Sequence, residues 1–262
     1  MNARKGPTAE VALGLWLDEL ESALAAVDAA YADAQWREHV GRAGAAELSR
    51  LEVARAELLL DPEKRERLQD WHGRPHDPAL ARRVTLCWRR FRWAEIASQP
   101  EIYALRNRID QSIVAFRPQV NGKTISRAER VQILRDHPDR AWRRAAWRAM
   151  APLSERVEAD VRELLRRRQC LARRLGYAGF VDWALDVTGL NRAWVVAQFE
   201  ALGERTAGVY RDWLAASAQR LALVEGLGPW DLAFAAEKCV ALPDELFPHV
   251  GGLPAVQAVA VG

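Results

Sequence analysis

Two histidines lie four residues apart in the chain, which is the spacing that zinc hydrolases of the HExxH kind use to hold their metal. In that motif the two rings share one face of a helix, and the glutamate between them acts on the metal-bound water. Of the five histidines, only His72 and His76 have this spacing, in the stretch HGRPH. Gly73 and Pro75 interrupt any helix there, and no glutamate lies between the rings. We therefore assign no metal ligand and no catalytic residue to this stretch.

Other groups that could do chemistry lack the sequence context that would activate them. The chain contains no G-x-S-x-G elbow, and Cys170 follows the arginines 166–168 on a predicted helix surface, which favours a packing thiol beside solvated arginines. The stretch Asn121-Gly-Lys-Thr124 resembles the end of a phosphate-binding loop, but the first glycine and the strand-to-helix context are missing, so we interpret it as a turn. Four carboxylates fall on the polar side of a long predicted helix and are interpreted as a solvated face: Glu155, Glu158, Asp160 and Glu163.

Arginines alternate with tryptophans in one stretch, a pattern that could bind single-stranded nucleic acid. The residues are Arg143, Arg144 and Arg148 beside Trp142 and Trp147. Their i, i+4 spacing also fits one amphipathic helix, which predicts core tryptophans with arginine stems over their edges. The whole chain has 38 basic and 35 acidic residues, a net charge of only +3. This excess is too small to favour nucleic acid, and we expect no nucleic-acid partner.

The composition is that of a soluble globular protein. Half of the 262 residues are hydrophobic and 28% are charged, which is enough to bury one large core or two small ones. Cys87, Cys170 and Cys239 form no CxxC pair, so we expect no disulfide framework and a reducing, cytoplasmic location. Acidic residues from Asp18 onward interrupt the first apolar run before a signal peptide could form. No apolar run is long enough for a membrane span, so we expect no membrane partner.

The hydrophobic period is helical almost throughout. We expect a helical hairpin within residues 13–59, and further helices from Pro62 to about 72, over 84–97, from Ser126 to 137, from Pro138 to 175 with a kink at Pro152, over 180–185, from Asn191, and from Pro229. The element that Pro138 begins is expected to be the longest. Only the stretch 112–126 has extended character, because β-branched residues flank a proline and an Asn-Gly turn pair.

Local signals predict where these helices begin and end. Ser126 and Glu129 have the spacing of a capping box. Gly176 stands where a left-handed C-terminal cap would lie, and Asn191 is placed to cap the next helix. The fold class predicted is therefore a mostly α multi-helix array with at most one short hairpin near 112–124. We divide it into an N-terminal helical region, 1–111, and a second helical region, 112–262, with a soft boundary or as one continuous domain.

Two stretches, in order, resemble a known family. ELLRRRQCLARRLGYAGFVDWAL, residues 163–185, is similar to a helix of thimet oligopeptidase and oligoendopeptidase type zinc metallopeptidases. The matching positions of this pattern are Leu164, Arg168, Ala172, Leu175, Gly176, Tyr177, Phe180 and Leu185.

PWDLAFAAEK, residues 229–238, is similar to the Trp-Asp-Leu helix of the same family. The matching positions are Trp230, Asp231, Leu232, Glu237 and Lys238. Phe234 replaces the family's tyrosine, and Ala235 replaces its second aromatic residue. The flanking stretches 125–150 and 245–259 are compatible with the family, so the resemblance covers about residue 125 to the end.

The resemblance implies the helical wall of a zincin-like oligopeptidase, a hydrolase that cleaves short peptides with zinc. The family's HExxH helix and its further glutamate ligand lie C-terminal to the part that this chain resembles. We therefore expect a polypeptide truncated before the HExxH motif: it forms part of the peptide-binding cleft, holds no zinc ligand or cofactor, and is inactive alone. Peptides are expected as partners once the catalytic half is present. No substrate-binding residue can be carried over.

The alternative is a non-catalytic helical module that binds another protein, since eleven tryptophans could supply apolar anchors for an interface. The last residues, GGLPAVQAVAVG, are apolar without a polar cap. This tail predicts self-association, as expected of a cut domain.

Overall fold

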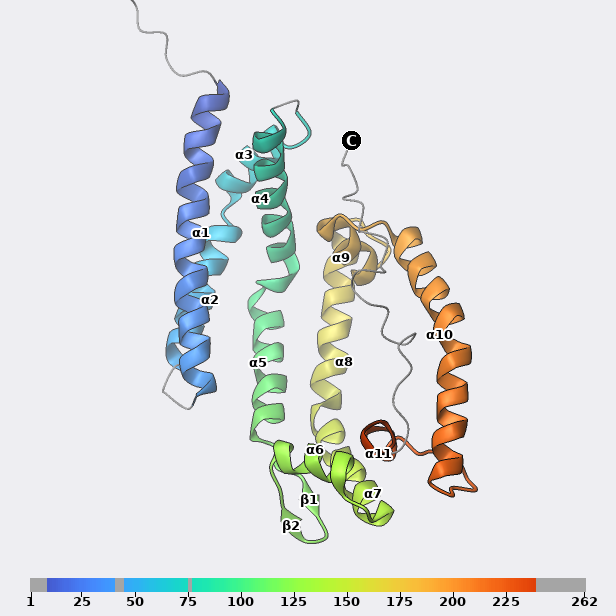
Figure 1. The fold of residues 1–262 in the computed structure, drawn as a ribbon. Coiled ribbons are helices and arrows are strands. Elements are labelled where there is room, and N and C mark those ends of the chain that lie inside the picture. The colour runs from blue at the N-terminus through green and yellow to red at the C-terminus, as the bar shows by residue number, and fades with distance from the viewer. Residues whose placement is uncertain (1–8, 41–44, 75–76, 239–262) are drawn as a thin grey trace, which may run out of the picture. The chain divides into compact units, whose positions relative to one another are not determined.

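The computed structural model describes residues 9–40, 45–74 and 77–238, and these are mostly helical (Figure 1). The single short hairpin joins β1 to β2 as antiparallel strands, with Gln119 opposite Thr124 and Val120 opposite Lys123. The predicted fold class, a mostly α array with one short hairpin near 112–124, is thus confirmed. The elements are α1 (Ala9–His39), α2 (Ala45–Leu59), α3 (Pro62–Trp71), α4 (Pro78–Ala97), α5 (Pro100–Ala115), β1 (Gln119–Val120), β2 (Lys123–Thr124), α6 (Arg127–Asp136), α7 (Arg140–Arg148), α8 (Ala151–Arg174), α9 (Phe180–Thr188), α10 (Arg192–Arg220) and α11 (Leu232–Lys238).

Side-chain caps explain where several helices start. The Ser126 hydroxyl accepts a hydrogen bond from the Glu129 N–H while the Glu129 carboxylate accepts one from the Ser126 N–H, so the predicted capping box of α6 is confirmed. The Asn191 side chain caps α10 by accepting from the Trp194 N–H. Gly176 has a φ of +88° after α8, the left-handed conformation predicted for it.

The chain forms two compact units, and each draws on two separate parts of the sequence. The first unit comprises Met1–Asn107 and Arg162–Leu190, and the second comprises Arg108–Val161 and Asn191–Gly262. Helices α5 and α8 each pass from one unit to the other. The boundary that we expected between residues 111 and 112 stays a prediction.

The first unit has its core around a helical hairpin. Helices α1 and α2 run side by side, as predicted, and α4 packs against both (Figure 1). Their buried faces meet in one apolar cluster, which contains Leu13, Leu17, Leu20, Leu24, Leu59, Leu68, Leu80, Val84, Cys87, Phe91 and Ala94. A second cluster joins the end of α4 to α8 and α9 through Ile96, Ala172, Trp183 and Val187. Burial of these side chains is the main stabilising term of the unit.

The second unit has a smaller core around the hairpin and α7. Val120 and Ile125 from the hairpin region pack with Leu134 of α6 and Ala146 of α7. Helix α11 packs on α6, and the preceding Trp230 lies against the same cluster.

Four expected boundaries are wrong, and so is the longest helix. The helix expected over 84–97 is α4, which already begins at Pro78, and no helix was expected where α5 begins. Residues 138–175 are not one kinked helix but α7 and α8, because Pro152 lies in the first turn of α8, where its missing N–H costs nothing. The longest helix in the described ranges is α1, with 31 residues against 24 in α8. Residues 112–115 continue α5, and the helix ends before Pro118, which disfavours helical backbone at the residue preceding it. The last described helix begins at Leu232 and not at Pro229.

Candidate functional site

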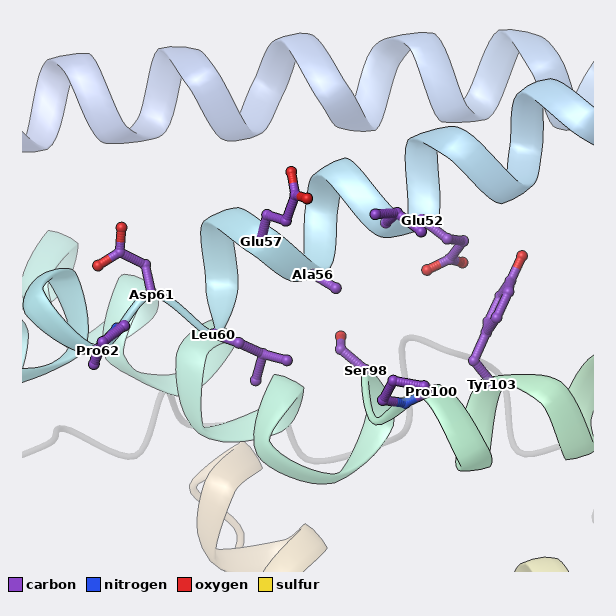
Figure 2. A pocket seen from close by; sticks show the side chains of 10 residues that line it. Glu52, Ala56, Glu57, Leu60, Asp61, Pro62, Ser98, Pro100 and Tyr103 are labelled. Atoms are coloured by element: carbon purple, nitrogen blue, oxygen red, sulfur yellow. The ribbon is translucent and has the colours of Figure 1, made fainter.

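A pocket lies in the first unit, between α2 and the junction of α4 with α5 (Figure 2). Its volume is about 590 Å³. We call it the α2–α5 pocket. Its lining residues are Glu52, Val53, Ala56, Glu57, Leu60, Asp61, Pro62, Ser98, Pro100 and Tyr103.

The backbone break between α4 and α5 opens this pocket. Helix α4 ends with its C-cap at Ser98, and α5 starts with Pro100, a residue that suits a first helical turn because it has no N–H to leave unpaired. The helical backbone is therefore interrupted between Ser98 and Pro100, opposite the end of α2 (Figure 2). The pocket was not predicted from the sequence, where the Ser-Gln-Pro joint at 98–100 was the available signal.

One end of the pocket carries a carboxylate between two tyrosines. Glu52 extends from α2 toward Tyr103 of α5 (Figure 2). The hydroxyl of Tyr31, on α1, is hydrogen-bonded to Glu52. Burial raises the pKa of Tyr31 to about 12, and the neighbouring negative charge of Glu52 adds to the effect. Tyr31 is therefore a neutral donor at physiological pH.

The opposite end of the pocket is already satisfied internally. Asp61 caps α3 by accepting from the Lys64 N–H, and its second oxygen pairs with the Lys64 ammonium. The hydrogen bonds from the Lys64 ammonium and backbone lower the pKa of Asp61. This end of the pocket therefore stabilises the start of α3 and offers no free carboxylate to a ligand.

A smaller pocket of about 260 Å³ lies in the same unit and shares Leu60 with the α2–α5 pocket. It is lined by Leu59, Leu60, Arg65, Glu95, Gln99, Leu171, Arg174 and Leu175. Its one carboxylate, Glu95, is paired with Arg65 at 2.7 Å and with Arg92 at 3.1 Å. Because both partners neutralise it, this carboxylate ties α3 to α4 and offers no free charge.

The first family-like segment forms a polar network inside the first unit. The Arg92 guanidinium donates to the Tyr177 hydroxyl at 2.6 Å, and that hydroxyl donates to Asp186. Burial, together with the hydrogen bond to Asp186, raises the pKa of Tyr177. The network joins α4, the turn after α8, and α9. Tyr177 thus holds helices together.

The second family-like segment centres on a fully buried carboxylate. Asp231 has no exposed surface, and it accepts from Arg143 at 2.9 Å, from Arg140 at 3.0 Å and from the Gly228 N–H at 3.0 Å. The Arg143 guanidinium also donates to the carbonyls of His137 and Pro138 and lies 4.1 Å from the centre of the Phe234 ring. These contacts fasten the start of α11 to α7.

The arginine and tryptophan stretch differs from its predicted arrangement. Arg143 is only 2% exposed while Trp147 is 44% exposed, so here the arginine is in the core and a tryptophan is on the surface. The reason is the ion pair with Asp231, since a buried charge is tolerated when it is paired and hydrogen-bonded. Trp142 is half-buried and stacks on His137 with ring centres 5.2 Å apart.

The carboxylates and arginines that were interpreted as solvated are partly paired. Asp160 binds Arg108 at 2.7 Å, and Glu163 binds both Arg166 and Arg167. The hydrogen bonds from these two arginines lower the pKa of Glu163 to about 2. These contacts are structural ion pairs on the surface.

No set of side chains in the described residues is arranged to hold a metal. Among residues 9–40, 45–74 and 77–238, no group of three or more His, Cys, Asp or Glu side chains could bind an ion. The rings of His72 and Trp88 contact each other in a tilted arrangement, with centres 5.5 Å apart, and burial lowers the pKa of His72. His76 and Cys239, and the 251–262 tail, lie outside the described residues. Cys170 is exposed, which corrects its interpretation as a packing thiol, and Cys87 is buried.

Within the same ranges, no helix has the length and apolar character needed to cross a bilayer.

Comparisons with known proteins returned no relative. No family model matches the chain, no curated protein matches it, and no solved structure matches it.

Proposed function

We propose that this chain is the helical, non-catalytic part of a thimet oligopeptidase or oligoendopeptidase type zinc metallopeptidase. In this role it forms a wall of the peptide-binding cleft and does not cleave peptides by itself. A cytoplasmic location belongs to the proposal. The two motifs that carry the resemblance, residues 163–185 and 229–238, are its basis.

The observation that carries the proposal is the position of Asp231. The Trp-Asp helix start, the more distinctive of the two motifs, is fastened to α7 by a carboxylate with three hydrogen bonds and no exposed surface. Tyr177 of the other motif is likewise engaged, with Arg92 and Asp186. Motif residues used in this way support a scaffold role, because their polar groups are occupied within the fold.

The described residues do not fit a zinc site. Zinc needs three or four converging nitrogen, sulfur or carboxylate ligands, and no such group occurs in the part of the chain that the structure describes. We therefore derive no hydrolytic step for these residues. In this proposal, metal chemistry belongs to a catalytic half outside them.

A peptidase assay tests the proposal. The purified chain is incubated with zinc and a quenched fluorescent nonapeptide, with and without EDTA, and binding of a fluorescein-labelled copy of the peptide is followed by anisotropy. We expect saturable peptide binding and no EDTA-sensitive cleavage. Cleavage that co-elutes with the chain would refute its non-catalytic role, and absence of peptide binding would refute its role in a cleft.

The genomic reading frame gives an independent test. Translation of the coding DNA beyond codon 262 should reveal an HExxH helix and a later glutamate ligand. Their absence from the gene and from its neighbours would leave the resemblance without a catalytic half.

A second candidate is a helical module that binds another protein, and α10 favours it. This helix exposes Trp194 by 49%, Phe199 by 69% and Leu202 by 42%. Large apolar side chains that are exposed on one helix are typical of association surfaces. Tight binding of one protein partner by a monomeric chain that binds no peptide would favour this candidate. Concentration-dependent sedimentation would separately test the predicted self-association.

A further inference from the structure

We propose that the α2–α5 pocket binds a small organic cation, an apolar chain that ends in a single ammonium group, with the ammonium at Glu52 and Tyr103. The site is independent of the peptidase proposal, because none of its lining residues lies in the stretches that carry the resemblance, 163–185 and 229–238. The volume, the lining and the charge of the pocket support it.

The volume and the lining suit an apolar ligand body. Pockets for small molecules in proteins have volumes of about 300–1000 Å³ and mostly apolar walls, and this one has about 590 Å³. Val53, Ala56, Leu60 and Pro100 provide apolar wall between its two ends. Leu60 points into the space from the end of α2, facing Ser98 (Figure 2). Val53 is 57% exposed, so a ligand body would remove apolar surface from water.

The charge of the lining selects a cation. Three lining residues are acidic and none is basic. Among the acids, Asp61 is paired with Lys64, and the carboxylate of Glu57 points away from the pocket toward α1 (Figure 2). Glu52 is left as the one carboxylate directed at the space. An anionic ligand would meet repulsion without a counter-charge.

Glu52 has acceptor capacity to spare. A carboxylate has about four acceptor positions, and a Tyr31 hydroxyl uses one. Tyr31 is neutral, so this hydrogen bond leaves the negative charge uncompensated. Within the described residues Glu52 forms no ion pair. The positive charge of Arg106, on α5, acts on Tyr31, but Arg106 does not line the pocket.

Tyr103 completes the binding end. Its side chain stands on α5 opposite Glu52 and closes the pocket on that side (Figure 2). A tyrosine ring attracts a cation to its face, and a carboxylate forms a charge-assisted hydrogen bond with an ammonium group. Together they favour one cationic head group over a neutral hydroxyl of the same size.

The experiment compares three probes of equal chain length on the full chain. Binding of n-hexylammonium, n-hexanol and hexanoate is measured by ligand-observed NMR titration. We expect hexylammonium to bind at least about five-fold more tightly than hexanol, the value of one charged contact at a partly exposed site, and hexanoate to bind least. Equal affinity for the three probes, or tighter binding of hexanoate, would overturn the proposal.

Two variants locate the binding. Glu52→Gln keeps an acceptor for Tyr31 but removes the charge, and it should reduce the affinity for hexylammonium to that for hexanol. Glu66→Gln is the matched control, because Glu66 is exposed on α3 and its replacement removes the same charge outside the pocket. Equal losses in both variants would show a general charge effect and overturn the assignment to Glu52.

A third variant fills the space. Ala56→Phe places a ring in the middle of the pocket and should abolish binding of hexylammonium and hexanol alike, with the helical circular dichroism unchanged. Retained binding in this folded variant would show that the probes bind elsewhere. Competition by the peptide acetyl-Ala-Lys-Ala-amide would identify a lysine side chain as the source of the cation. Hexylammonium binding without such competition would identify a free amine, and either result supports the site.

Discussion

Asp231→Asn should loosen the attachment of α11 far more than the loss of a surface carboxylate would. The substitution keeps the shape of the side chain but removes the charge that faces Arg143. Arg143 is 2% exposed, and its guanidinium would keep only neutral acceptors, namely the carbonyls of His137 and Pro138 and the amide oxygen of the asparagine. Breaking a buried ion pair from one side costs about 3–5 kcal/mol, because the remaining charge stays buried without its partner. Loss of the ion pair with Arg140 adds less to this cost, since the Arg140 side chain is 33% exposed and water can replace the lost contact.

Hydrogen exchange is the appropriate assay, because a chain of two units need not unfold in one step. The Ala235 N–H donates to the Asp231 carbonyl in the first turn of α11, and it reports opening of that helix. A loss of about 3 kcal/mol corresponds to roughly a hundred-fold faster exchange. Asp160→Asn is the control: its pair with Arg108 is on the surface, and we expect a far smaller change there.

Two results would refute the reasoning. Exchange in Asp231→Asn at nearly the wild-type rate would mean that the carboxylate contributes little. The second test adds Arg143→Met to Asp231→Asn. Because this removes the unpaired charge, the double variant should recover part of the lost protection. A strictly additive further loss would mean that the two side chains are not coupled.

Three further predictions follow. The pKa of Tyr31 is raised from 10.0 to about 12, so its contribution to stability is complete below pH 10 and is lost as pH rises through 12. The difference in absorbance at 295 nm between wild type and Tyr31→Phe should show this titration, and Glu52→Gln should lower the pKa of Tyr31. Ser126→Ala removes a cap of α6 and should cost about 1 kcal/mol in urea unfolding, while a neutral effect would contradict the capping box. Gly176→Ala should destabilise the protein by about 1 kcal/mol, because Gly176 has a φ of +88°. Gly208→Ala, in the interior of α10, should instead stabilise it. A change of the same sign in the free energy of unfolding for both variants would refute the backbone argument.

Much of the fold could be predicted because its signals are local. The capping box at Ser126 and Glu129 depends on a spacing of three residues, and the cap at Gly176 depends on a single backbone conformation. The failures are also local in origin. Pro152 was interpreted as a kink within one helix, although proline also occurs readily in the first turn of a new helix. Only the end of α7 at Ala149 distinguishes a kink from a new helix.

The polar networks could not be predicted, because they join residues that are distant in sequence. Asp231 meets Arg143 across 88 positions, and Arg92 meets Tyr177 across 85. The sequence suggested that Arg143 would cover a tryptophan edge at the surface, since arginine is seldom buried. A partner brought in by the tertiary fold reversed that expectation.

The sequence by itself determined the helical class, several helix ends and the short hairpin, because hydrophobic period, caps and turn residues act over a few positions. Tertiary structure alone decided which helices pair beyond the α1–α2 hairpin, which charges are buried, and where a pocket remains between α2 and α5. These depend on the meeting of whole faces, and no short stretch of sequence contains both partners. Glu52 and Tyr103 are ordinary residues on two separate helices, and they become a candidate binding site only when packing sets them at one end of the same space.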